Sequence, residues 1–333
     1  MRLKLVDGYQ SKLSLIETQK AVKEVKSIFE DNLARQLHLT RVVAPLFVQG
    51  DTGLNDNLSG VETPVTFDTD YMRNLQIVHS LAKWKRSALK RYEFEYNTGL
   101  YTDMNAIRKD EEVSNVHSIH VDQWDWEMRI RKEDRTDAML EKVVRDIYKA
   151  FKVTEIQINA QYDYLTNKLP DDITFITSQE LYDMYPDLDD KGRETAIVKK
   201  YKAVFLKQIG GNLKCGHPHD LRAPDYDDWE LNGDILFYNP VLDSVIEVSS
   251  MGIRVDENSL VKQLELSGNM DRLKLKYHQD IVNKSLPYTV GGGIGKSRVC
   301  MFFLEKLHIG EVQSSLWPEE MVDLCKEHNI ILL

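Results

Sequence analysis

Apolar residues recur every three or four positions in several long segments of the chain, which is the spacing of one buried helix face. This pattern predicts helices over residues 12–38, 80–91, 135–167, 257–268, 270–284 and 295–307. Ser14 and Glu17 form a capping-box pair at the start of the first helix, and Thr177 with Glu180 marks the start of another.

Extended segments rich in β-branched and aromatic residues separate these helices. The predicted strands cover residues 41–48, 61–69, 74–78, 99–107, 118–127, 173–176, 204–209, 235–238 and 241–249. Pro45 removes a backbone donor, so the strand over 41–48 is expected at a sheet edge or an interface. Because no repeat, low-complexity tail or linker is visible, we expect one α+β domain over residues 1–333, with an antiparallel-centred sheet flanked by helices.

Polar residues occur on both faces of the predicted strand over 118–127. Alternation gives one face with Ser118, His120, Asp122, Trp124 and Trp126, and another with Ile119, Val121, Gln123, Asp125 and Glu127. Inward polar groups cost free energy unless they have partners. A ligand groove is therefore one interpretation of this strand, and a solvated edge strand is the alternative.

Candidate nucleotide chemistry is concentrated near the C-terminal end. Asp234 and Glu247 lie on consecutive predicted strands, and hard divalent cations take such oxygen ligands. The glycine-rich run 291–295 precedes the helix that carries Arg298, and glycine allows close approach to the backbone. Arginine can meet a phosphate or stack on a flat ring. Together with Arg108, these residues indicate a nucleotide site on an antiparallel sheet.

Composition narrows the class of protein. The chain has 333 residues, 42% of them hydrophobic and 29% charged, which is ordinary for a globular protein. No apolar run approaches the roughly 20 residues of a membrane span, and no secretory signal is visible after Met1. Three cysteines do not suggest a disulfide framework. We therefore expect a cytoplasmic protein without membrane contact.

Two weaker signals are discounted. Cys215, His217 and His219 lack the second ligand pair of a structural zinc site. The basic segment 83–91 could be a nucleic-acid patch, but the net charge of −10 argues against a broad basic footprint. We expect no nucleic-acid partner.

The order of motifs resembles the catalytic core of class II aminoacyl-tRNA synthetases. Arg108 ends the first strand of a strand–loop–strand motif, residues 291–298 match a glycine-rich strand followed by a helix bearing arginine, and Pro45 matches the proline of a dimer interface. The resemblance narrows to the ammonia-dependent asparagine synthetases, the bacterial aspartate–ammonia ligases. It is carried by the strings at residues 56–60, 79–86, 121–127, 222–229, 231–234 and 249–255. Similarity covers nearly the full length and implies a homodimer.

The resemblance implies a two-step reaction. ATP adenylates the β-carboxylate of L-aspartate and releases pyrophosphate, and ammonia then attacks the β-aspartyl adenylate to give L-asparagine and AMP. Preorganised cations stabilise charge on the α-phosphate, and Arg108, Arg254 and Arg298 are expected in this role. Asp234 and Glu247 would hold Mg²⁺ with ATP.

The resemblance also assigns contacts to the substrates. Further nucleotide contacts are expected from Ser118, Gly293 and Gly295. Contacts to aspartate are expected from Ser80, Lys85, Gln123, Asp125, Asp227, Ser249 and Ser250, with Ser80 and Lys85 near the α-carboxylate. Asp56 is the expected acceptor of the ammonium proton, with Asp227 as the alternative. A structural role for Asp56 in an Asx turn also remains open.

Two other classes of function remain open at this stage. A true aminoacyl-tRNA synthetase would carry an anticodon-binding domain, and none is apparent in this short, acidic chain. A catalytically silent nucleotide- or amino-acid-sensing paralogue would bind ATP without turnover, but the retained Arg108, Arg298, Asp234 and Glu247 argue against that. Glutamine is not expected as nitrogen donor, because no amidotransferase cysteine is evident.

Overall fold

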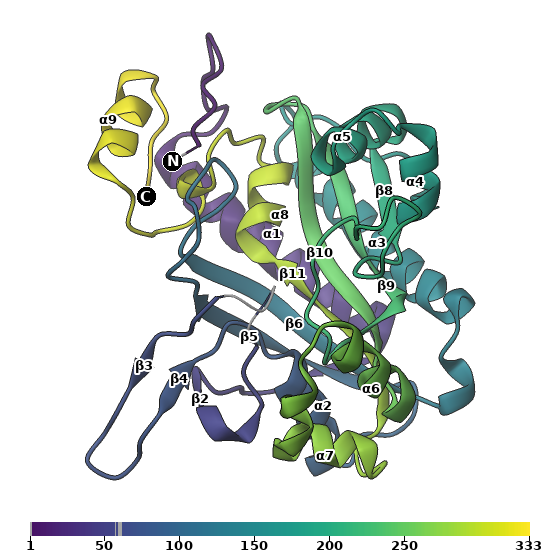
Figure 1. Ribbon diagram of the computed structural model, residues 1–333. Helices are drawn as coiled ribbons and strands as arrows, with labels where there is room; N and C mark the ends of the chain where they lie inside the picture. Colours follow the sequence, from purple (N-terminus) through teal and green to yellow (C-terminus); the bar gives the residue numbers. More distant parts are fainter. Residues whose placement is uncertain (1, 57, 59–61) are drawn as a thin grey trace.

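The largest element of the computed structural model is an eight-stranded sheet, and the structure describes residues 2–56, 58 and 62–333 (Figure 1). The strand order is β1-β5-β6-β11-β10-β9-β8-β7. Pairings from β5 through to β8 are antiparallel, whereas the edge strands β1 and β7 pair in parallel with their neighbours. The predicted α+β class with an antiparallel-centred sheet is confirmed.

The strands of this sheet are β1 (Leu39–Arg41), β5 (Gly99–Ile107), β6 (His120–Ile130), β7 (Thr174–Thr177), β8 (Ala203–Lys207), β9 (Asp227–Asn239), β10 (Ser244–Arg254) and β11 (Tyr288–Gly295). A smaller sheet contains β2 (Phe47–Gln49), β3 (Thr66–Phe67) and β4 (Leu75–Ile77) and forms an arm that extends from the main body (Figure 1).

The α-helices are α1 (Leu15–Leu37), α2 (Ala82–Arg91), α3 (Asp137–Gln161), α4 (Ser178–Met184), α5 (Asp190–Tyr201), α6 (Glu257–Leu266), α7 (Lys276–Val282), α8 (Lys296–Phe303) and α9 (Glu319–Glu327). Short 3₁₀ turns are η1 (Gly50–Thr52), η2 (Lys132–Asp134), η3 (Met270–Lys274) and η4 (Ile309–Glu311). Both predicted capping boxes, at Ser14–Glu17 and Thr177–Glu180, are confirmed. No helix in the described part of the chain combines the length and apolar character that a membrane crossing requires.

One face of the sheet is buried against α1, α3 and α8. Trp124 of β6 packs on Phe29 of α1 with ring centroids 4.8 Å apart, and Phe29 in turn packs on Phe151 of α3 at 4.6 Å. Trp126, two residues along the same strand, is also fully buried in this cluster. Burying a large aromatic side chain contributes about 1.5–3 kcal/mol, so this face fixes the helices on the sheet.

The opposite face of β6 is polar, as the alternation of the strand predicts. Asp125 and Glu127 are buried there and meet Lys85 of α2. Helix α2 covers β6 and β11 on this side, and α5 lies against β9 and β10. The sheet therefore has an apolar face that holds the fold together and a polar face between α2 and α5.

Several predicted boundaries are wrong. The strand expected over 41–48 is two short strands in different sheets, with Pro45 between β1 and β2. The helix expected over 270–284 is divided into η3 and α7 by Leu275, whose ψ of 145° is extended. Helices α5 and α9 were not predicted, and the strand expected over 235–238 begins at Asp227.

Candidate active site

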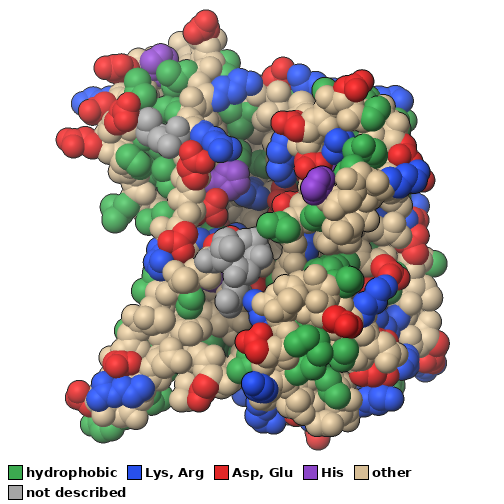
Figure 2. Space-filling model, viewed as in Figure 1, with side chains coloured by type: hydrophobic (Ala, Val, Ile, Leu, Met, Phe, Trp, Pro, Cys, Tyr) green, Lys and Arg blue, Asp and Glu red, His purple; other side chains and the backbone are tan. Residues whose placement is uncertain are grey.

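A cavity of about 330 Å³ opens on the polar face of the sheet. Figure 2 shows charged and histidine side chains gathered around a hollow on this side of the molecule. The loop between β5 and β6, β6 itself, β10, β11, α8 and the segment before β9 contribute to its lining. The predicted site residues that line it are Arg108, Ser118, Gln123, Glu247, Ser249, Ser250, Gly293, Gly295 and Arg298.

Arg108 and Arg298 are far apart in the sequence and line the same cavity. Arg298, on the first turn of α8, donates to the carbonyl of Val116 at 3.2 Å and to that of Glu247 at 3.0 Å. Arg108 donates from Nη2 to the His79 carbonyl at 3.5 Å, and its buried Nε has no hydrogen-bond partner. Both guanidinium groups therefore belong to one cavity lining, and that of Arg108 retains an unused donor.

The field of these two arginines acts on other titratable groups at the site. Burial raises the pKa of Glu111, against the opposing effect of Arg108 and then Arg298. Burial and the charge of Arg298 lower the pKa of His117 to about 4. His117, which accepts or donates a 2.7 Å hydrogen bond with Ser114, is therefore neutral near pH 7. These arginines can meet an anionic ligand, and the same lining also carries the acids Glu62, Glu111, Asp122, Asp220 and Glu247.

Asp234 and Glu247 lie on adjacent antiparallel strands, as predicted. Asp234 of β9 pairs in register with Ser250 of β10, three residues beyond Glu247. Burial raises the pKa of Asp234 to about 7, with Arg222 opposing and Glu247 adding to the rise. Burial also raises the pKa of Glu247, but Arg298 and Arg222 outweigh it and the net shift is downward.

The Asp234 carboxylate has one oxygen in use and one free. Its Oδ2 accepts a hydrogen bond from Arg222, whereas its Oδ1 is buried without a partner. A buried carboxylate oxygen with no donor is costly unless a cation or donor meets it. Among the described residues, no group of three or more His, Cys, Asp or Glu side chains could hold a metal ion. Any cation here would therefore need further oxygen ligands from its own ligand or water.

The glycines of β11 make room for side chains of the neighbouring strand. A Cβ added at Gly291 would collide with the carboxylate of Glu127, and one added at Gly293 would collide with the amide oxygen of Gln123. Gly293 and Gly295 also line the cavity. The glycine run therefore allows polar side chains of β6 to pass beneath β11, in addition to leaving its backbone accessible to a ligand.

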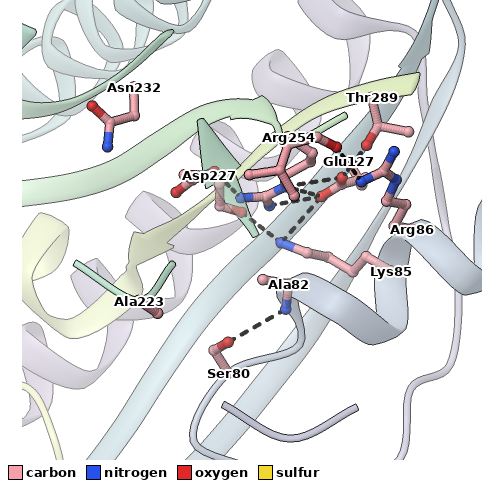
Figure 3. A network of polar contacts seen from close by, with 12 residues as sticks. Ser80, Ala82, Lys85, Arg86, Glu127, Ala223, Asp227, Asn232, Arg254 and Thr289 are labelled. Atoms are coloured by element: carbon pink, nitrogen blue, oxygen red, sulfur yellow. Dashed lines mark hydrogen bonds and ion pairs between the residues drawn. The ribbon is translucent and has the colours of Figure 1, made fainter. Parts of the chain in front are cut away.

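A buried ionic network lies on the same polar face of the sheet, between the strands and α2 (Figure 3). Arg254 of β10 donates Nη2 to Glu127 Oε2 at 2.7 Å and Nε to both carboxylate oxygens, and it also pairs with Asp227. Thr289 adds a 2.6 Å hydrogen bond to Glu127. Lys85 pairs with Asp125 and donates to the Gly292 carbonyl at 2.9 Å. The network connects α2, β6, β9, β10 and β11.

Two predicted ligand contacts are not available in this geometry. The guanidinium of Arg254 is 2% exposed and already bound to Glu127 and Asp227, and it does not line the cavity. We therefore correct its expected contact with the nucleotide to a structural ion pair. Lys85 is fully buried and bound to Asp125, so it lies below the cavity rather than in its lining.

Asp125 and Ser249 keep unused hydrogen-bonding capacity near the network. Asp125 Oδ2 and Ser249 Oγ are buried and have no hydrogen-bond partner. Ser249 lines the cavity, and Asp125 pairs across β11 with Gly293, which also lines it. Ser249 can therefore meet a polar ligand in the cavity, whereas Asp125 is buried just outside the lining with one oxygen unused.

Asp56 is buried beside the cavity rather than in its lining. Its carboxylate accepts hydrogen bonds from the backbone of Leu58 at 3.0 Å and from the Ser80 hydroxyl at 3.1 Å. The first is the local contact of an Asx turn, so the structural role considered for Asp56 is present. Burial raises the pKa of Asp56, although Lys83 opposes the rise. A carboxylate with a raised pKa is a better proton acceptor than an exposed one.

Sequence reasoning missed several charged residues at the site. Arg222 lines the cavity and pairs with Asp234. Lys191 of α5 also lowers the pKa of Glu247, but its effect is smaller than those of burial, Arg298 and Arg222. Arg222 could have been noticed because it lies only twelve residues before Asp234. Nothing in the local sequence of α5 marks Lys191. Cys215, discounted as a zinc ligand, is an exposed free thiol.

The fold has counterparts among solved structures. Asparaginyl-tRNA synthetase from Pyrococcus horikoshii, complexed with asparaginyl-adenylate, superposes with a TM-score of 0.67 over 90% of this chain and 70% of that chain, at 15% identity. The Entamoeba histolytica asparaginyl-tRNA synthetase complex gives a TM-score of 0.63 over 90% and 66%, at 14% identity. The protein thus has the class II aminoacyl-tRNA synthetase-like fold.

Sequence comparison then gives the family. A family model described as aspartate-ammonia ligase matches residues 16–329. Aspartate–ammonia ligases from Clostridium perfringens and Clostridium tetani are each 60% identical to this chain over its whole length. The matched region covers 99% of the first protein and 98% of the second. The chain belongs to the aspartate-ammonia ligase family, whose reaction makes asparagine from aspartate and ammonia.

Proposed function

We propose that the protein makes L-asparagine in an ATP-dependent, AMP-forming reaction through a β-aspartyl-adenylate. The observation that carries this proposal is the convergence of Arg108 and Arg298 on one cavity floored by Gly293 and Gly295. Adenylate formation transfers charge onto the α-phosphate, and preorganised cations are the usual means of stabilising it. The similar fold of the synthetase complexed with asparaginyl-adenylate supports the same kind of intermediate.

The first step overcomes the poor electrophilicity of a carboxylate. The β-carboxylate of aspartate attacks the α-phosphorus of ATP, its new bond to phosphorus forms, and pyrophosphate leaves. Arg298 is held by two backbone carbonyls, so it offers its charge in a fixed direction. Arg108 has a free Nε donor for the same phosphate. Ser118, which also lines the cavity, would contact the nucleotide.

The acids on β9 and β10 fit a magnesium ion that accompanies ATP. Asp234 Oδ1 is buried without a partner, and Glu247 lies on the adjacent strand in the cavity lining. Carboxylate oxygens are the ligands that Mg²⁺ takes, usually together with phosphate oxygens and water. Bound there, Mg²⁺ would neutralise phosphate charge.

Aspartate would bind deeper than the nucleotide, over the buried network. Gln123, Ser249 and Ser250 line the cavity there, and Asp125 offers an unused oxygen that suits the α-ammonium group. Ser80 and Lys85, which the sequence places near the α-carboxylate, lie outside the cavity lining and would act by holding the carboxylates of Asp56 and Asp125. Asp227 stays bound to Arg254 and would shape the rim of this site.

In the second step ammonia attacks the β-carbonyl carbon of the adenylate, and AMP leaves. Most of the ammonia is ammonium at pH 7, so a base must take its proton. Asp56 is our proposed acceptor, because burial raises its pKa and Leu58, two residues along the chain, lines the cavity. Asp227 is the alternative, but its carboxylate already binds Arg254.

The variant Asp56→Ala tests this division between the two steps. We expect it to retain aspartate-dependent exchange of pyrophosphate with ATP and to lose asparagine formation by about 10²–10⁴-fold, the usual contribution of a general base. Asp51→Ala, which removes an exposed acid from the same segment, is the matched control. Equal loss of both activities in Asp56→Ala would reject the assignment.

The homodimer and the cytoplasmic location expected from the sequence remain predictions. Light scattering of the purified protein would measure the first, and fractionation of cells that express it would measure the second.

A further inference from the structure

A second buried cluster of charges lies outside the cavity, around Asp225. Lys83 of α2 donates to Asp225 Oδ2 at 2.7 Å, Arg272 of η3 at 3.0 Å, and His278 of α7 contacts the same oxygen at 2.9 Å. Asp225 and His278 are fully buried, and Lys83 is 3% exposed. Helix α2 and the neighbouring elements η3 and α7, which are distant from α2 in the sequence, therefore meet at one carboxylate oxygen.

Lys83 connects this cluster to the segment that carries Asp56. Its ammonium group also donates to the backbone carbonyl of Asn55 at 3.1 Å. The Asn55 side chain accepts hydrogen bonds from the backbone of Asp56 at 2.9 Å and of His79 at 3.0 Å. Asp225 thus fixes Lys83, and Lys83 fixes the backbone immediately before Asp56.

The other side of Asp225 leads to the floor of the site. Tyr226 lines the cavity, and its carbonyl accepts a 2.9 Å hydrogen bond from Val255. Asp227 begins β9 and binds Arg254. The cluster is therefore attached to the sheet two residues away, and it holds the Asp56 segment at a set position relative to that sheet.

Stability alone is a weak explanation for such a cluster. Buried ion pairs often contribute little net stability compared with well-packed apolar residues, because removing charges from water is costly. Burial opposes ionisation of Asp225, but Lys83 and His278 outweigh it and hold its pKa far below its usual range. The carboxylate therefore remains charged and keeps its three donors in fixed directions, which is a geometric role.

We propose that Asp225, with Lys83 and His278, is a positioning centre that holds Asp56 for the ammonia step. None of the three side chains lines the cavity, so they act through the Asn55–Asp56 backbone rather than on a substrate. The proposal rests on the role proposed for Asp56. It assigns the connection between β10 and β11, which contains η3 and α7, a part in the second step of the reaction.

The variant Lys83→Met tests the link between the cluster and Asp56. Met keeps the length of the side chain but cannot donate to Asn55 or Asp225. We expect the KM for ammonium to rise at least about tenfold, with the aspartate KM and the pyrophosphate exchange changed less than about twofold. Lys83→Arg restores the charge and should recover part of the loss. Lys90→Met, at an exposed lysine of the same helix, is the matched control.

A second pair of variants separates positioning from stability. His278→Gln keeps a donor near the place of Nε2, and His278→Leu removes it. We expect only His278→Leu to raise the ammonium KM. Leu264→Ala removes a buried side chain from the apolar cluster beside α7, and it should lower stability without changing the ratio of the two activities. Unchanged ammonium KM in both Lys83→Met and His278→Leu would overturn the proposal, as would equal loss of both half-reactions.

Failure of this proposal differs from failure of the role proposed for Asp56. If Asp56→Ala loses asparagine formation selectively but Lys83→Met does not raise the ammonium KM, only the positioning role is rejected. If Asp56→Ala leaves both activities intact, Asp56 is not the proton acceptor and the positioning proposal is rejected with it.

Discussion

Individual side chains at this site are held by partners that decide what each can do. Arg298 is held by two backbone carbonyls and lines the cavity. Arg254 has its guanidinium group bound to Glu127 and Asp227. The two residues have the same chemistry, and only their neighbours distinguish a group available to a ligand from a structural one. The same reasoning applies to Lys85, whose charge serves Asp125 beneath the cavity.

His308 makes the stability of the fold depend on pH. Burial lowers its pKa to about 4, from an ordinary value near 6.5 in the unfolded chain. Between those values the unfolded chain binds a proton that the folded chain does not, so stability is full above about pH 6.5 and falls as the pH drops toward 4. Each such group contributes a slope of at most about 1.4 kcal/mol per pH unit.

His308→Asn tests this effect. Asn can keep the hydrogen bond that the Gly310 backbone donates to Nδ1 at 3.0 Å, but it does not titrate. We expect urea unfolding between pH 6.5 and 4 to show a shallower loss of stability in the variant, while His117, His79 and the shifted carboxyl groups contribute the slope that remains. An unchanged slope would contradict this account of His308.

At the scale of elements, β11 and α8 form the centre of the site. The register of β11 sets Gly291 opposite Glu127, and α8 begins directly after Gly295 with Arg298 on its first turn. Asp122 of β6 accepts a hydrogen bond from the Ser297 backbone at 3.2 Å and so holds the start of α8. One strand and one helix thus place both the accessible backbone and the arginine.

Gly291→Ala tests the need for close strand contact. The added Cβ would collide with the Glu127 carboxylate and would lie 2.7 Å from the Trp126 carbonyl, and Glu127 cannot move without releasing Arg254. We expect a loss of about 1–3 kcal/mol in unfolding free energy, as for an overpacked core. Gly211→Ala is the control, because an added Cβ there meets nothing within 4 Å. Equal denaturation midpoints for the two variants would contradict the role given to this glycine.

Elements with a regular apolar stripe could be predicted from the sequence, and others could not. Helix α1 buries Val25, Phe29 and Leu33 at helical spacing, so its pattern is readable. Helix α5 buries Arg193 and Glu194 together with two aliphatic residues. Because half of its buried side chains are charged, its sequence lacks the regular apolar pattern that predicts a helix. The extended backbone at Leu275 interrupts an otherwise helical pattern because tertiary packing overrides local propensity.

The site was predictable to the extent that motifs mark it. Arg108, Arg298 and the glycine run could be found because they end strands or begin a helix in a recognisable order. The cluster around Asp225 could not, because it depends on contacts with helices distant in the sequence. Arg222 is near Asp234 in the sequence, but no motif marks it. Sequence alone also cannot tell that Arg254 is already bound to two carboxylates.

At the scale of the whole molecule, the residues that stabilise the fold and the residues of the proposed active site lie on opposite faces of the sheet. Helices α1, α3 and α8 bury the apolar face of the sheet, and the opposite face carries the cavity and the ionic network. The chain has a net charge of −10, and the cavity lining combines Arg108, Arg222 and Arg298 with the acids Glu62, Glu111, Asp122, Asp220 and Glu247. Salt screens surface charge beyond about 10 Å, so the three arginines can contact a polyanionic nucleotide directly despite the negative charge elsewhere on the chain.

The most direct test of the central claim is the fate of ATP during turnover. We would incubate the purified protein with ATP, Mg²⁺, aspartate and ammonium, and quantify AMP, ADP and asparagine in the same samples. Attack at the α-phosphorus predicts one AMP for each asparagine and no ADP above background. ADP formed in proportion to asparagine would show attack at the γ-phosphorus and contradict the adenylate mechanism.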